Sequence, residues 1–265
     1  MQLSCVFLRL KDKKYNKQKD KSMKKMMICG LASMLLLFTS CVDLRMSNTL
    51  KPSDTVAEKE MKMEPFDKVE LDAMGHVKIV QSQDNDYRVV LSAPDNYLDL
   101  FTFKVNDGEL EMGLSDMAKN LETAHVNATI YTPRLVKVDN EGLCKLHVDS
   151  LRTKLLKVEN SGVGAMSLHG LKVDKISVDC SGVGGIKLSG VAAWANLDCS
   201  GVGSIDAKAL KARRVQGEVS GVGGIECYAS DSLKASVSGV GAFRYAGKPS
   251  KKILDESGIG KISEL

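Results

Sequence analysis

The residues that could most readily carry out chemistry are six serines. Each is followed by glycine and preceded two positions earlier by an oxygen-bearing side chain. They occur in "NSGVGAM", "CSGVGGI", "CSGVGSI", "VSGVGGI", "VSGVGAF" and "ESGIGKI", and are Ser161, Ser181, Ser200, Ser220, Ser238 and Ser257. Three kinds of site use such residues: a serine nucleophile, a glycine loop that binds phosphate, and a row of carboxylates that binds cations. The spacing of the motif bears on all three.

The motif returns at nearly constant intervals of 20, 19, 20, 18 and 19 residues. A phosphate-binding loop normally occurs once, between a strand and a helix, and the sequence offers no such context. A serine nucleophile needs a base within hydrogen-bond reach, but no histidine recurs near the motif, and His169 is a single instance in a turn. Identical serines predict identical structural roles, with hydroxyls bonded to the corner backbone, and the protein is not expected to be an enzyme.

The residues around each serine alternate as they do in β-strands. Positions five and seven after it are apolar, as at Met166 and Leu168, and so are positions three and five before it, as at Val158 and Leu156. Each repeat therefore contains two strands joined by a tight corner. This pattern predicts an all-β fold, a β-solenoid of the parallel β-helix kind with coils of about 19–20 residues.

Glycine suits such a corner because it has no Cβ atom and tolerates positive φ and close approach of the neighbouring coil. The residues between the glycines, Val163, Val183, Val202, Val222, Val240 and Ile259, are expected to point into the core. The predicted structural corners are Ser161, Gly162, Gly164, Ser181, Gly182, Gly184, Ser200, Gly201, Gly203, Ser220, Gly221, Gly223, Ser238, Gly239, Gly241, Ser257, Gly258 and Gly260.

The first part of the domain is more irregular. Two decayed repeats are predicted at Met74-Gly75 and at Glu141-Gly142, and Asn106-Asp107-Gly108 predicts a tight β-hairpin turn. We expect a single domain over residues 66–265.

Acidic residues recur two positions before the corner serine. With the decayed repeats included, they are Asp72, Asp139, Glu159, Asp179, Asp198, Glu218 and Asp255, and Ser236 takes the remaining position. Carboxylates stacked about 4.8 Å apart repel by roughly 1 kcal/mol per pair in water. Cations such as Ca²⁺ could offset this, or each carboxylate could accept a backbone N–H across its corner. The second interpretation is favoured because the Gly-Asp alternation of calcium-loaded repeats is absent, and no metal is predicted.

Four cysteines remain outside the N-terminal segment: Cys144, Cys180, Cys199 and Cys227. Cys180 and Cys199 occupy the same position in adjacent coils, where a disulfide is close enough but fits the bond dihedral poorly. Val219 and Val237 fill that position later, which favours a row of small apolar side chains. The absence of a CxxC pair and of histidines at ligand spacing argues against zinc, and no cofactor is predicted.

The N-terminus contains a targeting signal. Residues 23–40 have a basic start, an apolar run and a small-residue end before Cys41. The ending "FTSC" resembles the lipobox of bacterial lipoproteins, which implies that Cys41 is lipidated; the alternative is an ordinary signal peptide with an incidental cysteine. We expect residues 1–22 to be an upstream extension and residues 41–64 to be a polar tether.

The charge of the chain changes when this segment is removed. Residues 1–40 hold 9 of the 37 Lys and Arg residues but only 2 of the 33 Asp and Glu residues, so the net charge falls from +4 to −3. Nucleic-acid binding therefore loses its compositional support.

These features together resemble the head GIN domain family, also labelled putative auto-transporter adhesin and common in Bacteroidetes. The resemblance is carried by the lipobox, by "FDKVELDAMGHVKIVQ", by "VNATIYTPRLVKVDNEG" and by the serial "SGVG" corners. It covers about Phe66–Leu265 and implies a β-helical fold, adhesion and no catalytic residues.

The predicted function is that of a lipid-anchored, non-catalytic binding module at the outer membrane, facing the periplasm or the cell surface. Its partner would be an envelope or extracellular protein or glycan. The alternative is a structural or sensory accessory of the envelope without a ligand. A polysaccharide-active β-helix enzyme is disfavoured, because the coils are uniform and the repeats contain few aromatic residues. Exposed strand edges leave open a homo-oligomer, or a monomer whose edge is protected by Lys261 and Glu264.

Overall fold

The computed structural model describes residues 49–83, 85–118, 121–122 and 124–265. Thr49–Leu265 forms one compact unit with its own hydrophobic core. The predicted extension, the signal peptide and Cys41 lie outside the described residues. Within the described part of the chain, no helix is long and apolar enough to cross a membrane.

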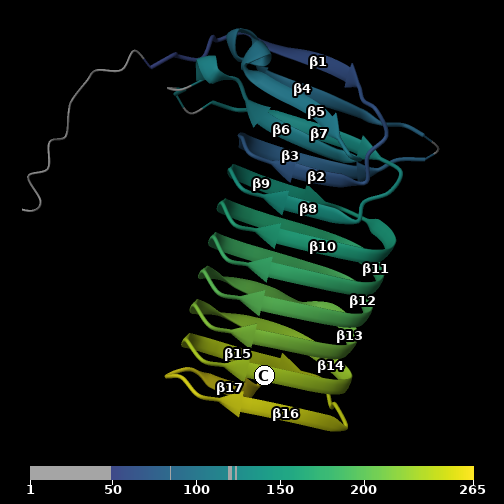
Figure 1. The fold of residues 1–265 in the computed structure, drawn as a ribbon, viewed down its shortest axis with the longest axis vertical. Helices are drawn as coiled ribbons and strands as arrows, with labels where there is room; N and C mark the ends of the chain where they lie inside the picture. The colour runs from purple at the N-terminus through teal and green to yellow at the C-terminus, as the bar shows by residue number, and fades with distance from the viewer. Residues whose placement is uncertain (1–48, 84, 119–120, 123) are drawn as a thin grey trace, which may run out of the picture. The chain divides into compact units, whose positions relative to one another are not determined.

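The second half of the chain is a β-solenoid, which confirms the predicted fold class (Figure 1). Its parallel strands are β8 (Lys137–Asn140), β9 (Leu143–Val148), β10 (Leu151–Asn160), β11 (Val163–Cys180), β12 (Val183–Cys199), β13 (Val202–Val219), β14 (Val222–Val237), β15 (Val240–Ala246), β16 (Lys251–Glu256) and β17 (Lys261–Glu264). Each coil pairs with the next so that equivalent residues lie side by side. Val163, for example, is opposite Val183, and Val183 is opposite Val202.

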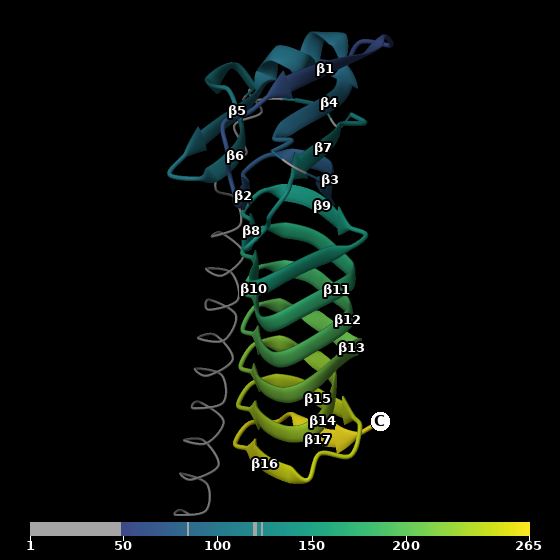
Figure 2. The same cartoon turned by 90° about the vertical axis from the view of Figure 1, so that its right-hand side faces the viewer.

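Each long strand bends twice between one corner and the next. In β11, buried and exposed residues alternate except where two neighbouring residues both stay out of the core, at His169-Gly170 and again at Asp174-Lys175. A strand with period two can keep its apolar side inward past such a pair only by bending. Each coil therefore has three sides, and the curved strands are visible in Figure 2.

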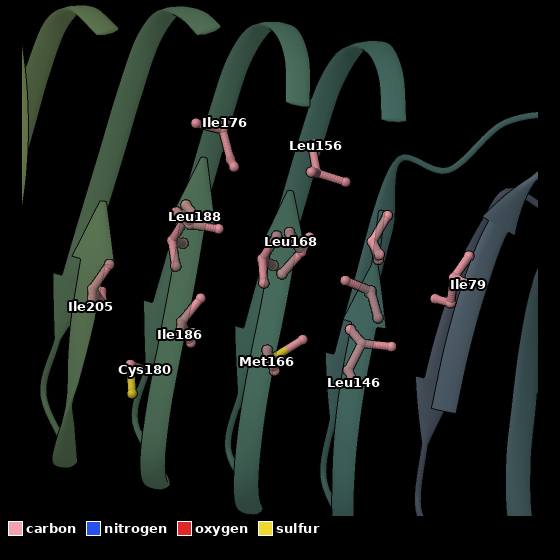
Figure 3. Packing of buried hydrophobic residues seen from close by; sticks show 14 of the residues in the cluster. Ile79, Leu146, Leu156, Met166, Leu168, Ile176, Cys180, Ile186, Leu188 and Ile205 are labelled. Carbon is pink, nitrogen blue, oxygen red and sulfur yellow. The ribbon is translucent and has the colours of Figure 1, made fainter. Parts of the chain in front are cut away.

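The core consists of columns of like residues that run along the solenoid. One column contains Met166, Ile186, Ile205, Ile225 and Phe243, all at most 1% exposed. A second inward column follows the strand before the corner and includes Leu156 and Ile176 (Figure 3). These are the apolar positions predicted from the repeat. Full burial of each such side chain contributes about 1.5–3 kcal/mol.

The prediction that the corner valines point into the core is wrong. Val163, Val183, Val202, Val222 and Val240 are 49–56% exposed, and Ile259 is 83% exposed. The reason is parity: the buried residues lie five and seven positions after the serine, so the residue two positions after it must face outward.

The N-terminal part begins with β1 (Val56–Lys62), β2 (Lys68–Leu71), β3 (Met74–Gln81), β4 (Arg88–Pro94) and the 3₁₀-helix η1 (Asp95–Leu100). It continues with β5 (Phe101–Asn106), β6 (Glu109–Leu114), the 3₁₀-helix η2 (Asp116–Ala118) and β7 (Asn127–Thr132). Strands β2 and β3 form the coil next to β8 and β9, with Met74 opposite Leu143. The two decayed repeats are therefore neighbours in space.

The strands between these repeats cover the first coil. Strand β6 pairs in parallel with β2, and β7 pairs in parallel with β3. On its other side β7 pairs antiparallel with β4, and β4 pairs antiparallel with β1. The predicted hairpin joins β5 to β6, with positive φ at Asp107 and Gly108. This change to antiparallel pairing closes one end of the solenoid and protects its strand edge.

The prediction of a tether through residue 64 is wrong from Val56 onward. All seven residues of β1 pair with β4, from Val56 opposite Pro94 to Lys62 opposite Arg88. Most side chains of β1 are exposed, so its attachment depends on backbone pairing, which leaves no apolar pattern in the sequence. The Tyr97 hydroxyl also donates a hydrogen bond to the carbonyl oxygen of Leu50 at 2.6 Å.

The opposite end of the solenoid carries charges in its inward columns. Lys252 follows Leu233, Glu256 follows Val237, and Glu264 follows Tyr245 in the register. The Glu256 carboxylate accepts the N–H of Ile262 at 2.6 Å. Inward-pointing charges at a sheet edge disfavour the addition of another strand.

Substitutions on the two sides of β12 should separate inward from outward positions. Ile186→Ala is expected to cost about 2–5 kcal/mol of stability because it leaves a cavity in a buried column. Val183→Ala, on the outside of the same strand, should cost less than about 1 kcal/mol. Urea unfolding followed by circular dichroism checks both. Equal losses would contradict the outward assignment of the valines.

Candidate functional site

The corners are held by backbone hydrogen bonds between coils. The amides of Ser161 and Gly162 both donate to the carbonyl of Asn140, at 3.0 and 2.8 Å, and the amide of Val163 donates to the carbonyl of Gly142 at 2.9 Å. The same arrangement recurs at later corners. Gly184 has φ +139°, and a Cβ atom there would overlap the carbonyl oxygen of Gly164. Glycine is therefore required by both conformation and space.

The corner serines are exposed, and in the described part of the chain none of their hydroxyls makes a hydrogen bond. The predicted hydroxyl bonds to the corner backbone are wrong, because carbonyls of the neighbouring coil already accept the corner N–H groups. Without a base nearby, these hydroxyls have no means of activation as nucleophiles.

The contact that comes nearest to a catalytic pair joins His169 Nδ1 to Ser189 Oγ at 3.0 Å. The two residues lie one coil apart, which explains why spacing along the sequence did not reveal the contact. The His169 ring packs against His147, which pairs with Asp149. Among the described residues no carboxylate bonds to His169, so it lacks the third group that orients a catalytic base.

The four cysteines of the domain are buried free thiols. Burial raises the pKa of Cys144 to about 11 and that of Cys227 to about 12. Cys180 and Cys199 lie opposite each other in the register, where the contact between their thiols raises the pKa of Cys199 and lowers that of Cys180. All four thiols are buried, and these side chains act as small core residues.

The acidic residues form one column on the outside of the strand before the corner. In spatial order the column contains Glu111, Glu70, Asp139, Glu159, Asp179, Asp198, Glu218, Ser236 and Asp255. The assignment of Asp72 to it is wrong, because Glu70 lies opposite Asp139. Gly75 corresponds to the second glycine of the corner rather than the first, which shifts the alignment by two residues.

Among the described residues, lysines form ion pairs with the column near one end only. Lys137 Nζ lies 3.0 Å from Glu109, 3.5 Å from Asp139 and 3.9 Å from Glu159, and Lys157 lies 2.7 Å from Glu159. Burial and the neighbouring Glu159 nevertheless raise the pKa of the Asp139 carboxyl.

Farther along the column, neutral side chains replace these lysines. Ser177, Asn196 and Gln216 take the equivalent positions beside Asp179, Asp198 and Glu218. Partial burial and the charges of Asp179 and Glu218 raise the pKa of Asp198.

Neither explanation offered for the acidic column matches the geometry. Among the described residues, no carboxylate of the column accepts a backbone N–H across its own corner, so the favoured Asx-turn interpretation is wrong. In the same part of the chain, no group of three or more His, Cys, Asp or Glu residues could hold a metal ion. The column is therefore a consequence of stacking, compensated by lysines where Lys137 and Lys157 are present.

Two further surfaces run along the solenoid. The first, the apolar ridge, begins the strand after each corner and consists of Leu143, Val163, Val183, Val202, Val222, Val240 and Ile259. The second, the basic strip, lies on both sides of the bend that precedes the acidic residue on each long strand. It consists of Arg152, Lys154, Lys172, Lys175, Lys211, Arg213, Arg214 and Lys251, all exposed.

The model of the family described as "Putative auto-transporter adhesin, head GIN domain" matches residues 65–249. This chain belongs to the head GIN domain family. Among solved structures, a protein from Bacteroides fragilis that is named a putative adhesin is 32% identical to this chain, with a TM-score of 0.79. The similarity covers 82% of this chain and 100% of that one.

Two more distant structures share the fold of this head GIN domain. A putative lipid binding protein from Parabacteroides distasonis is 18% identical with a TM-score of 0.66, covering 82% of this chain and 99% of that one. A putative adhesin from Parabacteroides merdae is 20% identical with a TM-score of 0.61 and the same coverage. No curated protein matches the chain.

The uncompensated part of the acidic column should destabilise this head GIN domain at neutral pH. A carboxyl whose pKa is raised by folding binds its proton more tightly in the folded state. Stability therefore falls as pH rises from the unfolded pKa, about 3.9, through the higher folded pKa. Asp198→Asn should raise the melting temperature at pH 7, because it removes repulsion from Asp179 and Glu218, each pair costing at most roughly 1 kcal/mol of stability. It should change little at pH 3.

Glu159→Gln is the matched control, because Glu159 pairs with Lys157 and Lys137. This variant loses an ion pair together with the repulsion and should not gain stability. Differential scanning calorimetry at both pH values measures the effect. A lower melting temperature for Asp198→Asn at pH 7 would refute the repulsion.

Proposed function

We propose that this protein is a non-catalytic, adhesin-like binding module of the cell envelope, anchored by a lipid at Cys41. The observation that carries the proposal is the continuity of the outer surfaces. In-register coils turn single exposed residues into an apolar ridge, an acidic column and a basic strip, each of which follows the solenoid. Such surfaces suit extended partners, and the family name and the related adhesin structures support the same interpretation.

The chemistry of the surface supports binding rather than turnover. Among the described residues, the corner serines lack a base and the Ser189–His169 contact lacks an orienting acid. Burial raises the pKa values of the Cys144 and Cys227 thiols. The coils from β11 to β14 follow one another without inserted loops that could enclose a substrate. The partner of the module would be an envelope or extracellular protein or glycan.

The anchor is supported by the sequence of residues 23–41, which ends in a lipobox-like "FTSC". The outer membrane is the proposed location, on either its periplasmic or its surface face. The charged inward residues of the last coil, Lys252, Glu256 and Glu264, support a monomer rather than an edge-to-edge oligomer.

Substitution of Cys41 tests the anchor. Cys41→Ser should abolish incorporation of labelled palmitate and release the protein from the membrane fraction, because the acylated thiol is lost. Cys29→Ser, within the apolar run of the signal, serves as the control and should retain both the label and the membrane association. Persistent labelling of Cys41→Ser would contradict a lipoprotein.

An array experiment separates a binding module from an accessory without a ligand. Residues 42–265 contain the whole described core and can be produced without the signal. We expect saturable binding to at least one class of envelope glycan or protein, with the bound molecule recovered intact. Failure to bind any member of a broad array would favour the structural or sensory alternative.

A further inference from the structure

The basic strip concentrates positive charge on a protein whose chain after residue 40 carries a net charge of −3. Arg152, Lys172 and Lys211 lie in one register column, with Val191 between the lysines. Lys175, Arg214 and Lys251 lie in a second column, on the other side of the bend. Their charges therefore repeat along the solenoid at multiples of the strand spacing, about 4.8 Å.

Most of these cations are available to a ligand. Arg213 is paired with Asp231 at 2.8 Å. Hydrogen bonds from Ser230 and Arg213, together with the nearby charge of Arg214, hold the pKa of Asp231 below its usual range. Among the described residues, the other seven cations of the strip form no ion pair. Asp174 is a further carboxylate beside the strip, and its side chain is exposed.

Two aromatic rings are set among the cations. Lys175 Nζ lies 4.2 Å from the centre of the Trp194 ring, and Lys211 Nζ lies 3.9 Å from the centre of the Tyr228 ring. Trp194 is 39% exposed, which is unusual for so large an apolar side chain at a surface. An exposed ring held by a neighbouring cation presents a flat apolar surface together with positive charge.

A hollow of about 270 Å³ lies within the strip, where these features meet. Its aromatic and polar lining residues are Trp194, Arg214, Gln216, Ser232, Lys234 and Lys251, which belong to β12, β13, β14 and β16. The half-exposed Ile253 also lines it, together with two buried apolar residues of β13 and β14. Trp194, Arg214, Ser232 and Lys251 follow one another in a single register column. The hollow thus combines an aromatic ring, three cations and two neutral hydrogen-bonding side chains.

The carboxylates of the acidic column do not cancel the positive charge of the hollow. Glu218 and Asp255 lie four residues after Arg214 and Lys251 on the same strands, a separation of about 13 Å along an extended chain. This exceeds the Debye length of about 8 Å at physiological ionic strength. Gln216, the residue between Arg214 and Glu218 on this face, is neutral.

We propose that the basic strip binds a linear acidic polysaccharide, with one acidic sugar seated in the hollow beside Trp194. This inference rests on the proposed binding function and names the chemistry of its partner. Carboxylate or sulfate groups would pair with Arg214 and Lys251, hydroxyl groups would bond to Gln216 and Ser232, and a sugar ring would pack on Trp194. A polymer suits the strip because its charges, like those of the strip, repeat along a line.

An anionic membrane is the competing partner for a basic surface, and the geometry disfavours it. Insertion into a lipid surface needs apolar side chains that project together from a basic face. In the strip, Trp194 lines a depression. The other exposed apolar side chains there, Leu155, Val191 and Ile253, each lie beside a lysine in the register rather than together, and the continuous apolar ridge belongs to the strand on the other side of the corner. The test therefore includes vesicles.

Paired charge reversals test the proposal. Oligomers of polygalacturonic acid are the probe, neutral dextran is the reference polymer, and binding to residues 42–265 is measured by calorimetry at two salt concentrations. Arg214→Glu with Lys251→Glu is expected to weaken binding at least about tenfold and to reduce its salt dependence. Lys145→Glu with Lys187→Glu changes the net charge equally on exposed residues outside the strip, and should leave binding within about twofold.

The ring is tested separately. Trp194→Ala is expected to weaken binding several-fold while leaving the salt dependence unchanged, because it removes an apolar surface and no charge. Thermal melting of every variant confirms that the solenoid remains folded, as expected for exposed positions.

The outcomes distinguish this inference from the proposed function. Equal losses in both charge-reversal variants would show general charge attraction and overturn the assignment to the strip. Binding to phosphatidylglycerol vesicles without binding to the acidic oligomers would overturn the choice of partner. No binding to acidic oligomers, with saturable binding elsewhere on the array, would refute this inference but leave the binding module intact.

Discussion

The structure depends on the hydrogen bonds that hold one corner to the next. The amides of Ser161 and Gly162 share the carbonyl of Asn140, and the same bonds recur at the corner of Ser220 and Gly221, which share that of Cys199. Because these bonds join neighbouring coils at the same positions of each repeat, they set the register of the strands on both sides. Glycine permits the approach, since a Cβ atom at Gly184 would overlap the backbone of the preceding coil. Every column in the solenoid follows from this register.

Because the coils are in register, both the favourable and the unfavourable side-chain contacts of one coil are repeated in the next. In the core it places Ile186 beside Met166 and Ile205, so each apolar residue is covered by two similar ones. On the outside it places Asp198 between Asp179 and Glu218, where no lysine forms an ion pair with it in the described part of the chain. Burial of whole apolar columns stabilises the coils by far more than one row of carboxylates costs. The acidic column can therefore persist without a metal.

Much of the fold could be predicted from the sequence because a repeat shows its own periodicity. The intervals of 18 to 20 residues predicted the stacking of coils, and alternation predicted the buried positions at Met166 and Leu168. Strand β1 could not be predicted in this way, because backbone pairing attaches it without an apolar pattern. The position of Asp72 was wrong because one glycine of a degenerate corner can align with either glycine of a complete one. The valines were misplaced for a different reason: they are apolar, but the parity of the strand after the corner places them on the outside.

Surfaces were harder to predict than the core, because they depend on residues that the repeat does not constrain. The basic strip contains no motif: Arg152, Lys172, Lys175 and Arg214 become one surface only after the bends in each coil are placed. An uninterrupted stack also binds differently from a pocket formed by loops. Its charged groups are fixed to a regular backbone, so a repeating partner can meet several of them with little ordering of the protein. Each contact can then be weak, since linked contacts together raise the affinity when their spacing matches that of the partner. In the binding function proposed for this head GIN domain, the spacing of the coils is thus as much a determinant of recognition as any single side chain.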